Sequence, residues 1–167
     1  AYCDKDTEFA EMGSLSALNS LGGFYATSGD YPAYSWEVRQ VMNVAGALVN
    51  AEWVEPGDPP LVSAHGDQDG TVPYQGGNLD LGFASIGLEG SYLVDQEAQN
   101  EGVCSYLYTM VGQDHPSGNM SDAELDQIFN RLMPRMGATM LGLSYCCGSD
   151  VEIQPGGEIG MLPGDSL

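Results

Sequence analysis

The chain has 167 residues, 43% of them hydrophobic, and this size and composition are typical of one globular domain. Its 24 aspartates and glutamates stand against 4 lysines and arginines, for a formal net charge of -20, which excludes binding to nucleic acid or anionic lipid by charge. No run of about 18 apolar residues occurs, so no membrane span is expected. The first residues lack a signal-peptide pattern, so we expect any signal peptide to lie outside this sequence.

The first third of the chain is predicted to hold the end of a helix, a loop and a strand. Residues 1–12 are expected to finish a helix that begins upstream, because the chain opens without a capping residue. Residues 13–35 are rich in Gly, Ser and Tyr, which is typical of a loop or a lid-like excursion. Residues 38–48 (VRQVMNVAGAL) are β-branched and apolar enough to predict one buried strand.

The middle of the chain is predicted to alternate between strands and helices. Residues 53–60 form a turn-rich connector, and residues 61–64 form a short strand that leads into a His65-Gly66 loop. Residues 90–102 are expected to be a helix with its cap at Gly90-Ser91 and its end at Gly102. Residues 105–111 (SYLYTMV) are aromatic and β-branched, so they predict another strand.

A last helix is predicted after a capping box that runs from Ser121 to Glu124. Apolar residues at helical spacing form one face of this helix, and Pro134 is expected to help end it; the face consists of Leu125, Ile128, Phe129 and Leu132. The whole order of elements predicts an α/β fold with a parallel sheet. Residues 137–167 are a Cys-, Gly- and acid-rich tail to which the sequence assigns no role.

The four cysteines are Cys3, Cys104, Cys146 and Cys147, and their spacing matches no zinc pattern. An even number of cysteines favours disulfides, most simply between Cys3 or Cys104 and one of the adjacent pair, and the connectivity stays open. Disulfides would place the protein in an oxidising compartment. We therefore expect a secreted, extracellular or periplasmic protein with no metal ion and no cofactor.

Two loops that follow predicted parallel strands carry the titratable residues of interest. The first is HGDQDGTVPY (residues 65–74) and the second is GQDHP (residues 112–116). In an open parallel sheet, catalytic groups lie beyond the carboxyl ends of the strands, so Asp69 and His115 are expected at one edge. These loops resemble those of α/β-hydrolases of the esterase and lipase (carboxylesterase) type, which carry H-G-x-x-D-x-x-V-P after the seventh strand and G-x-x-H after the eighth.

The resemblance extends over roughly residues 1–133, because residues 43–47 (NVAGA) are similar to the family's sixth strand and Gly90-Ser91 to the start of its next helix. It implies that residues 1–136 are the C-terminal half of an α/β-hydrolase domain, with strands six to eight and flanking helices, incomplete as a stand-alone domain. It also implies that Asp69 is the acid that orients His115, and that His115 is the general base.

The nucleophilic serine of that family is expected to be absent from this chain. The family order is Ser, Asp, His, and no G-x-S-x-G occurs in the 167 residues. We therefore expect a complementary N-terminal polypeptide, or self-association that covers the edge of the strand at 38–48. The substrate implied by the resemblance is a small-molecule ester.

Three alternatives remain open at this stage. The chain is alternatively a non-catalytic acidic structural or assembly subunit built on a hydrolase-like scaffold. Peptidase activity is a second alternative, since prolyl-oligopeptidase-like enzymes share the first loop. Tyr74 and the loop aromatics either line an acyl pocket or pack against other loops. His65 and Asp67 are interpreted mainly as structural, and a calcium loop is disfavoured because Gly76 stands where its last ligand, a glutamate, would be.

Overall fold

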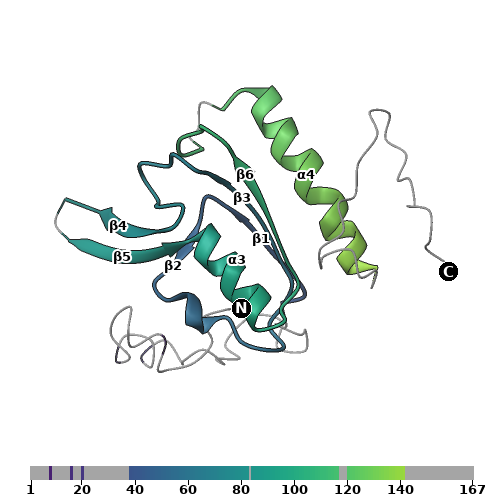
Figure 1. Cartoon of the computed structure of the whole chain (residues 1–167), viewed down its shortest axis with the longest axis horizontal. Helices are drawn as coiled ribbons and strands as arrows, with labels where there is room; N and C mark the ends of the chain where they lie inside the picture. Colours follow the sequence, from purple (N-terminus) through teal and green to yellow (C-terminus); the bar gives the residue numbers. More distant parts are fainter. Residues whose placement is uncertain are drawn as a thin grey trace.

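The computed structural model describes residues 8, 16, 20, 38–82, 84–116 and 120–141. These residues form a mixed α/β fold, in which a parallel sheet is flanked by helices (Figure 1). The predicted fold class is therefore confirmed. The elements are β1 (Val41–Val44), β2 (Ala47–Leu48), a 3-10 turn (Ala51–Trp53), β3 (Leu61–Gly66), β4 (Gly76–Asp80), β5 (Ser85–Gly90), α3 (Ser91–Asn100), β6 (Ser105–Met110) and α4 (Asp122–Met140).

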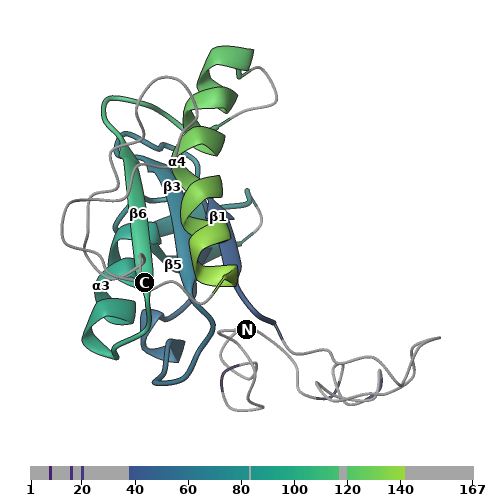
Figure 2. The same ribbon diagram turned by 90° about the vertical axis from the view of Figure 1, so that its right-hand side faces the viewer.

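The main sheet has the strand order β1-β3-β6, and every pair in it is parallel. Leu61 of β3 lies opposite Val41 of β1 on one side and opposite Ser105 of β6 on the other. Helix α3 covers one face of this sheet and helix α4 covers the other, with the strands between them (Figure 2). Because the strands are parallel, the loops that follow β3 and β6 leave the sheet at the same edge.

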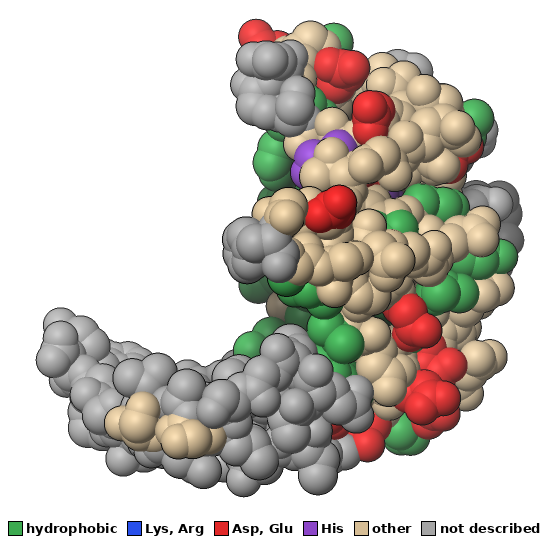
Figure 3. All heavy atoms as spheres, turned by 90° about the vertical axis from the view of Figure 1, so that its left-hand side faces the viewer, with side chains coloured by type: hydrophobic (Ala, Val, Ile, Leu, Met, Phe, Trp, Pro, Cys, Tyr) green, Lys and Arg blue, Asp and Glu red, His purple; other side chains and the backbone are tan. Residues whose placement is uncertain are grey.

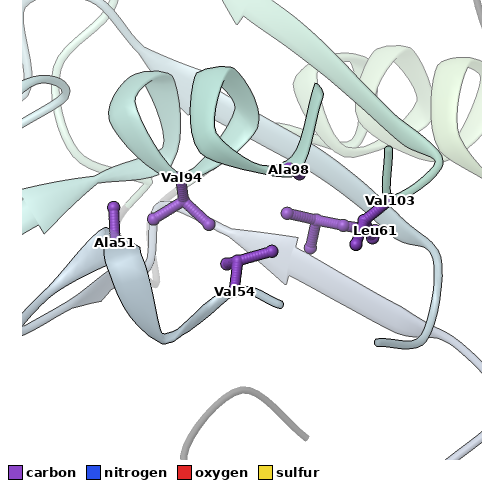
Figure 4. Packing of buried hydrophobic residues seen from close by; sticks show 6 residues of the cluster. All are labelled: Ala51, Val54, Leu61, Val94, Ala98 and Val103. Carbon is purple, nitrogen blue, oxygen red and sulfur yellow. The ribbon is translucent and has the colours of Figure 1, made fainter. Parts of the chain in front are cut away.

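The central strand β3 is buried along its whole length, and its side chains alternate between two cores. Leu61 points to the α3 side and packs in a core shown in Figure 4; the buried members of this core are Ala51, Val54, Leu61, Val94, Ala98 and Val103. Val62 and Ala64 point to the α4 side, where they pack against Ile128 and Leu132. Burying one such Leu or Ile side chain stabilises the fold by roughly 1.5–3 kcal/mol.

The single buried strand expected at residues 38–48 is wrong. The segment is divided into β1 and β2, which belong to different sheets, and the break falls at Ala45 and Gly46. Ala45 has a φ of 51°, in the left-handed region, and a Cβ on Gly46 would lie 2.1 Å from Oδ1 of Asn43. Strand β1 is also an edge within the described part of the chain, and Met42 and Val44 are each 40% exposed.

A second sheet, with the order β2-β5-β4, was not predicted. All of its pairs are antiparallel, and β4 and β5 form a hairpin that extends away from the parallel sheet (Figure 1). Strand β4 begins with Gly76-Gly77 and is almost wholly exposed, so it lacks the alternation of apolar and polar residues that identifies a half-buried strand. The hairpin lies next to the first residue of α3.

Helix α3 begins and ends as expected, with Gly90 at the N-cap position and Gly102 just beyond the end at a φ of 72°. Helix α4 also begins as expected, because Ser121 and Glu124 form a complete capping box. The expectation that Pro134 helps end this helix is wrong, since the helix continues to Met140. A proline removes one backbone N–H from the helix, and the turns after it still bond to one another.

Only half of the predicted apolar face of α4 is covered. Ile128 and Leu132 are buried against the sheet, whereas Leu125 and Phe129 are exposed. On the same helix, the guanidinium groups of Arg131 and Arg135 lie over the rings of Tyr108 and Tyr106 of β6. The helix is therefore held to the sheet by apolar packing and by two cation–π contacts.

Several predictions fall on residues that the structure does not describe. They include the predicted helix end at residues 1–12, of which only Glu8 is described, and the loop at 13–35, of which only Ser16 and Ser20 are described. The tail from residue 142 also lies outside the described residues. Three of the four cysteines also lie there, so the disulfide prediction stays a prediction. Cys104 is described, half-buried just before β6. Within the described residues, neither helix has the length and apolar character needed to cross a bilayer.

Candidate catalytic site

The loops that follow β3 and β6 are hydrogen-bonded to each other through backbone groups and through the side chain of Asp67. The Gln68 N–H donates to the Gln113 carbonyl oxygen at 3.0 Å, and the Gly112 N–H donates to Oδ1 of Asp67 at 2.6 Å. The approach is so close that a Cβ on Gly66 would lie 2.3 Å from the Gln113 carbonyl oxygen. Gly66 is therefore required by space, and Asp67 serves to tie the loops together.

This contact brings Asp69 and His115 within hydrogen-bond distance. Nδ1 of His115 lies 2.7 Å from Oδ2 of Asp69. The Asp69 side chain is 0% exposed, whereas the His115 side chain is 31% exposed. The carboxylate accepts a hydrogen bond from Nδ1–H, which leaves Nε2 as the imidazole nitrogen able to accept a proton from another group.

Asp69 also accepts two backbone N–H groups from its own loop. The N–H groups of Thr71 and Val72 each donate to Oδ1 at 2.8 Å. The short H-x-x-x-D-G turn places these amides directly after the aspartate, as happens when an Asp side chain bonds the backbone of a turn. The two carboxylate oxygens thus have different partners: Oδ1 holds the turn, and Oδ2 faces His115.

A second histidine, His65, contacts the same carboxylate oxygen. Its Nε2 lies 3.1 Å from Oδ2 of Asp69 and 3.1 Å from the Val72 carbonyl oxygen, and its side chain is 0% exposed. Both neighbours of Nε2 are acceptors, so this nitrogen carries a proton. From the sequence, His65 is interpreted mainly as structural. The structure places its ring in contact with the carboxylate of Asp69.

The far side of His65 is held by two residues that sequence reasoning did not assign to the site. Nδ1 of His65 lies 2.7 Å from Oγ of Ser91, and Nδ2 of Asn43 donates to the same Oγ at 2.9 Å. Ser91 is the first residue of α3, and its side chain caps no helix N–H, contrary to the role suggested by its position. The signal in the sequence that could have indicated this contact is Asn43, a polar residue among the apolar residues of β1.

Asp114 ties the two loops a second time. Its Oδ1 accepts the Gly70 N–H at 2.9 Å and the His115 N–H at 2.7 Å. The pKa of Asp114 lies below its usual value, mainly because it accepts a hydrogen bond from the Gly70 N–H. The hydrogen bond from the His115 N–H is the second cause. A charged Asp114 therefore fixes the backbone of His115 relative to the Asp69 loop.

Tyr74 packs against the loops and the sheet. Its hydroxyl lies 2.7 Å from Oγ1 of Thr109 on β6, and its ring meets the ring of His65 edge to face. The ring of Tyr92 lies on its other side, at 5.5 Å between centroids. Tyr74 supports the position of His65.

The arrangement suits proton transfer better than cation binding. Asp69 already accepts four N–H groups, so its oxygens are engaged by donors. Among the described residues, no group of three His, Cys, Asp or Glu side chains is placed to hold a metal ion. A groove of about 920 Å³ lies elsewhere, over the second sheet and Trp53, and neither Asp69 nor His115 lines it.

A histidine side chain reaches the surface at the loop edge of the molecule, between acidic side chains (Figure 3). His65 is buried, so the exposed imidazole is that of His115. Among the side chains coloured in this view, none is Lys or Arg. The surface around the candidate base is thus acidic and polar.

Comparisons with known proteins include a distant structural match. No family model matches the chain, and no curated protein matches it. A solved thermophilic esterase from the planctomycete Thermogutta terrifontis matches with 17% identity and a TM-score of 0.39. The match covers 65% of this chain and 31% of that esterase. The architecture described above is a mixed α/β fold with a parallel sheet flanked by helices.

Proposed function

We propose that this chain supplies the acid and the base of a secreted serine ester hydrolase of the carboxylesterase or lipase type. The observation that carries the proposal is the hydrogen bond between Oδ2 of buried Asp69 and Nδ1 of partly exposed His115. This bond selects the tautomer whose Nε2 is free to take a proton. Secretion is proposed on the even cysteine count and the acidic composition.

In the proposed reaction, Nε2 of His115 accepts the proton of a serine hydroxyl while the serine oxygen forms a bond to the ester carbonyl carbon. The bond from that carbon to the alcohol oxygen then breaks, and His115 returns the proton to the leaving alcohol. Water repeats the sequence on the acyl-serine, which releases the acid. Asp69 remains ionised throughout and stabilises the imidazolium each time it forms.

The serine of this reaction comes from outside the 167 residues, because no G-x-S-x-G occurs in them. We propose that a complementary polypeptide provides it and pairs with the edge of β1, or that self-association covers that edge. Support comes from the apolar side chains exposed along and just before β1: Val38 is 45% exposed, and Met42 and Val44 are similarly exposed. Within the described part of the chain, β1 pairs with β3 alone. An apolar strand edge of this kind favours pairing with another strand.

The test is the reaction of the native material with a fluorophosphonate probe, followed by intact-mass analysis of every polypeptide present. We expect a partner chain to become labelled, and the purified 167-residue chain alone to stay unlabelled. Asp69→Asn should slow labelling of the assembly by up to about 10⁴-fold, since the imidazole loses its orienting acid. Asp67→Asn is the matched control, because an amide oxygen can still accept the Gly112 N–H, and labelling should continue at the original rate.

Two outcomes would overturn the proposal. If no polypeptide is labelled, the chain belongs to a non-catalytic acidic structural or assembly subunit. If Asp69→Asn and Asp67→Asn are labelled at the same rate, the Asp69–His115 pair takes no part in activating the serine.

A further inference from the structure

We infer that His65 is a positioning residue for Asp69, so that one carboxylate oxygen is held by two histidines, only one of which faces substrate. This inference rests on the proposed function, because Asp69 needs a fixed orientation only if it orients His115. One of the two histidines precedes Asp69 in the chain and the other follows it. Nε2 of His65 lies 3.1 Å from Oδ2 of Asp69, and Nδ1 of His115 lies 2.7 Å from the same oxygen.

The proton inventory of His65 gives the direction of the hydrogen bond. Nε2 faces Oδ2 of Asp69 and the carbonyl oxygen of Val72, both at 3.1 Å, so it must donate. A donor at this position limits the rotation of the carboxylate about its last bond, since Oδ2 stays between two N–H groups while Oδ1 is held by Thr71 and Val72. The carboxylate plane is thereby fixed on both sides.

His65 can act in this way because its own ring cannot move. Oγ of Ser91 lies 2.7 Å from Nδ1, and Ser91 is in turn bonded to Nδ2 of Asn43 and to the Gly46 carbonyl oxygen. The ring of Tyr74 meets the His65 ring edge to face at 5.5 Å between centroids. Polar groups buried at this depth are stable only when bonded, and this orientation of the ring places both nitrogens within hydrogen-bond distance of polar partners.

The network joins three parts of the fold to the candidate site. Asn43 is on β1, Ser91 begins α3, and His65 is the fifth residue of β3. The position of Asp69 therefore depends on residues of β1, β3 and α3 as well as on the amides of its own loop. Removal of the His65 donor should let the Asp69 carboxylate turn and should weaken its hold on Nδ1 of His115.

The test uses ring-nitrogen NMR of the full 167-residue chain, whose only histidines are His65 and His115, so that two ring systems give all the signals. In the wild-type chain at about pH 8, we expect His115 to show the tautomer protonated at Nδ1. His65→Leu should convert His115 to a mixture of the two tautomers. His65→Gln should partly restore the original signal, because its amide can donate to the same oxygen. A merely structural role for His65 would leave the tautomer of folded His115 unchanged.

Asp69→Asn keeps the test decisive if His65→Leu does not fold, and it separates this inference from the proposed function. We expect Asp69→Asn to shift both the Nε2 signal of His65 and the Nδ1 signal of His115. If only the His115 signal shifts, or if folded His65→Leu leaves His115 unchanged, the positioning role is wrong and the Asp69–His115 pair stands. If neither histidine responds to Asp69→Asn, the pair itself is absent and the proposed function fails with it.

Discussion

The two faces of strand β3 have different chemistry, although both are covered by a helix. On the α4 side, Val62 and Ala64 pack in an apolar cluster with Ile128 and Leu132. On the α3 side, the strand begins with apolar Leu61 and continues with Ser63 and His65, which are buried and polar. One face is a hydrophobic core along its length, and the other changes from core to hydrogen-bond network toward the loops.

This difference shows how a small fold keeps a charged group in place at its edge. Apolar packing is non-directional and sets no orientation for a carboxylate, whereas hydrogen bonds fix both distance and angle. The apolar packing on both sides therefore supplies stability, and the polar part of the α3 side supplies orientation at some cost in buried polar surface. Changes on the two sides should have separable effects.

The largest expected effect is on the apolar face. Leu132→Ala should lower the free energy of unfolding by about 2–5 kcal/mol, because Leu132 is fully buried and its loss leaves a cavity against β3. Denaturant titration measures this change. Met133→Ala is the matched control, since the neighbouring Met133 is exposed and should change stability little. A loss below about 1 kcal/mol for Leu132→Ala would contradict the role of α4 as an apolar cover of β3.

At the loop edge, Gly66→Ala should lower stability by about 1–3 kcal/mol, because its Cβ would overlap the Gln113 carbonyl oxygen and force the two loops apart. The separation should also weaken the bond between Asp69 and His115, which the ring-nitrogen signals of His115 report. Gly70→Ala in the same loop is the control: its Cβ would lie 3.6 Å from Oδ1 of Asp114, an ordinary contact. Equal effects of the two changes would refute the close approach at Gly66.

On the polar face, Ser91→Ala should cost about 1–3 kcal/mol, since it leaves the buried groups of Asn43 and His65 without a shared partner. The loss of a single hydroxyl from an exposed position would be nearly neutral. Ser85→Ala, on exposed β5, provides that comparison and should change stability by less than about 0.5 kcal/mol. If both variants behave alike, the hydroxyl of Ser91 does not join the network.

The smallest effect concerns Asp95 on α3 and depends on pH. Burial raises the pKa of Asp95 above its usual value, despite hydrogen bonds that lower it, and Oδ1 has no partner in the described part of the chain. The folded state therefore favours the neutral carboxyl, and its contribution to stability declines as pH rises from the unfolded-state pKa through the raised folded-state pKa.

Asp95→Asn should consequently raise the melting temperature at neutral pH and change it little near pH 3, where the carboxyl is protonated in both states. Asp126→Asn, on an exposed position of α4, removes the same charge and controls for general relief of the net charge of -20. Equal stabilisation by both variants at neutral pH would show that burial of Asp95 has no part in the effect.

The sequence predicted the parallel sheet and the adjacency of Asp69 and His115 because both depend on short-range signals. Each loop directly follows an apolar strand, and turn residues such as Gly66 and Gly112 mark where the strands end. Glycines at both ends of α3 predicted its bounds, and a capping box predicted where α4 begins.

The polar network and the second sheet could not be predicted in the same way. Asn43, His65 and Ser91 come from three separate elements, and their contact depends on the tertiary arrangement of β1, β3 and α3. Strand β2 has two residues, and β4 opens with two glycines, so neither has a readable period. The division of residues 38–48 depends on the left-handed backbone at Ala45. Alanine rarely adopts this conformation, so the sequence does not predict a break there.

The turn at Ala45 and Gly46 connects the hairpin mechanically to the Asp69 loop. Gly46 accepts the Ser91 hydroxyl on its carbonyl, and the next residue, Ala47, pairs with Gly90 at the end of the hairpin strand β5. A displacement of the hairpin would therefore have to break these bonds or carry Ser91 with it, and Ser91 holds the ring of His65. A molecule that bent the hairpin would thereby disturb the position of His65 beside Asp69, at a distance from His115 itself.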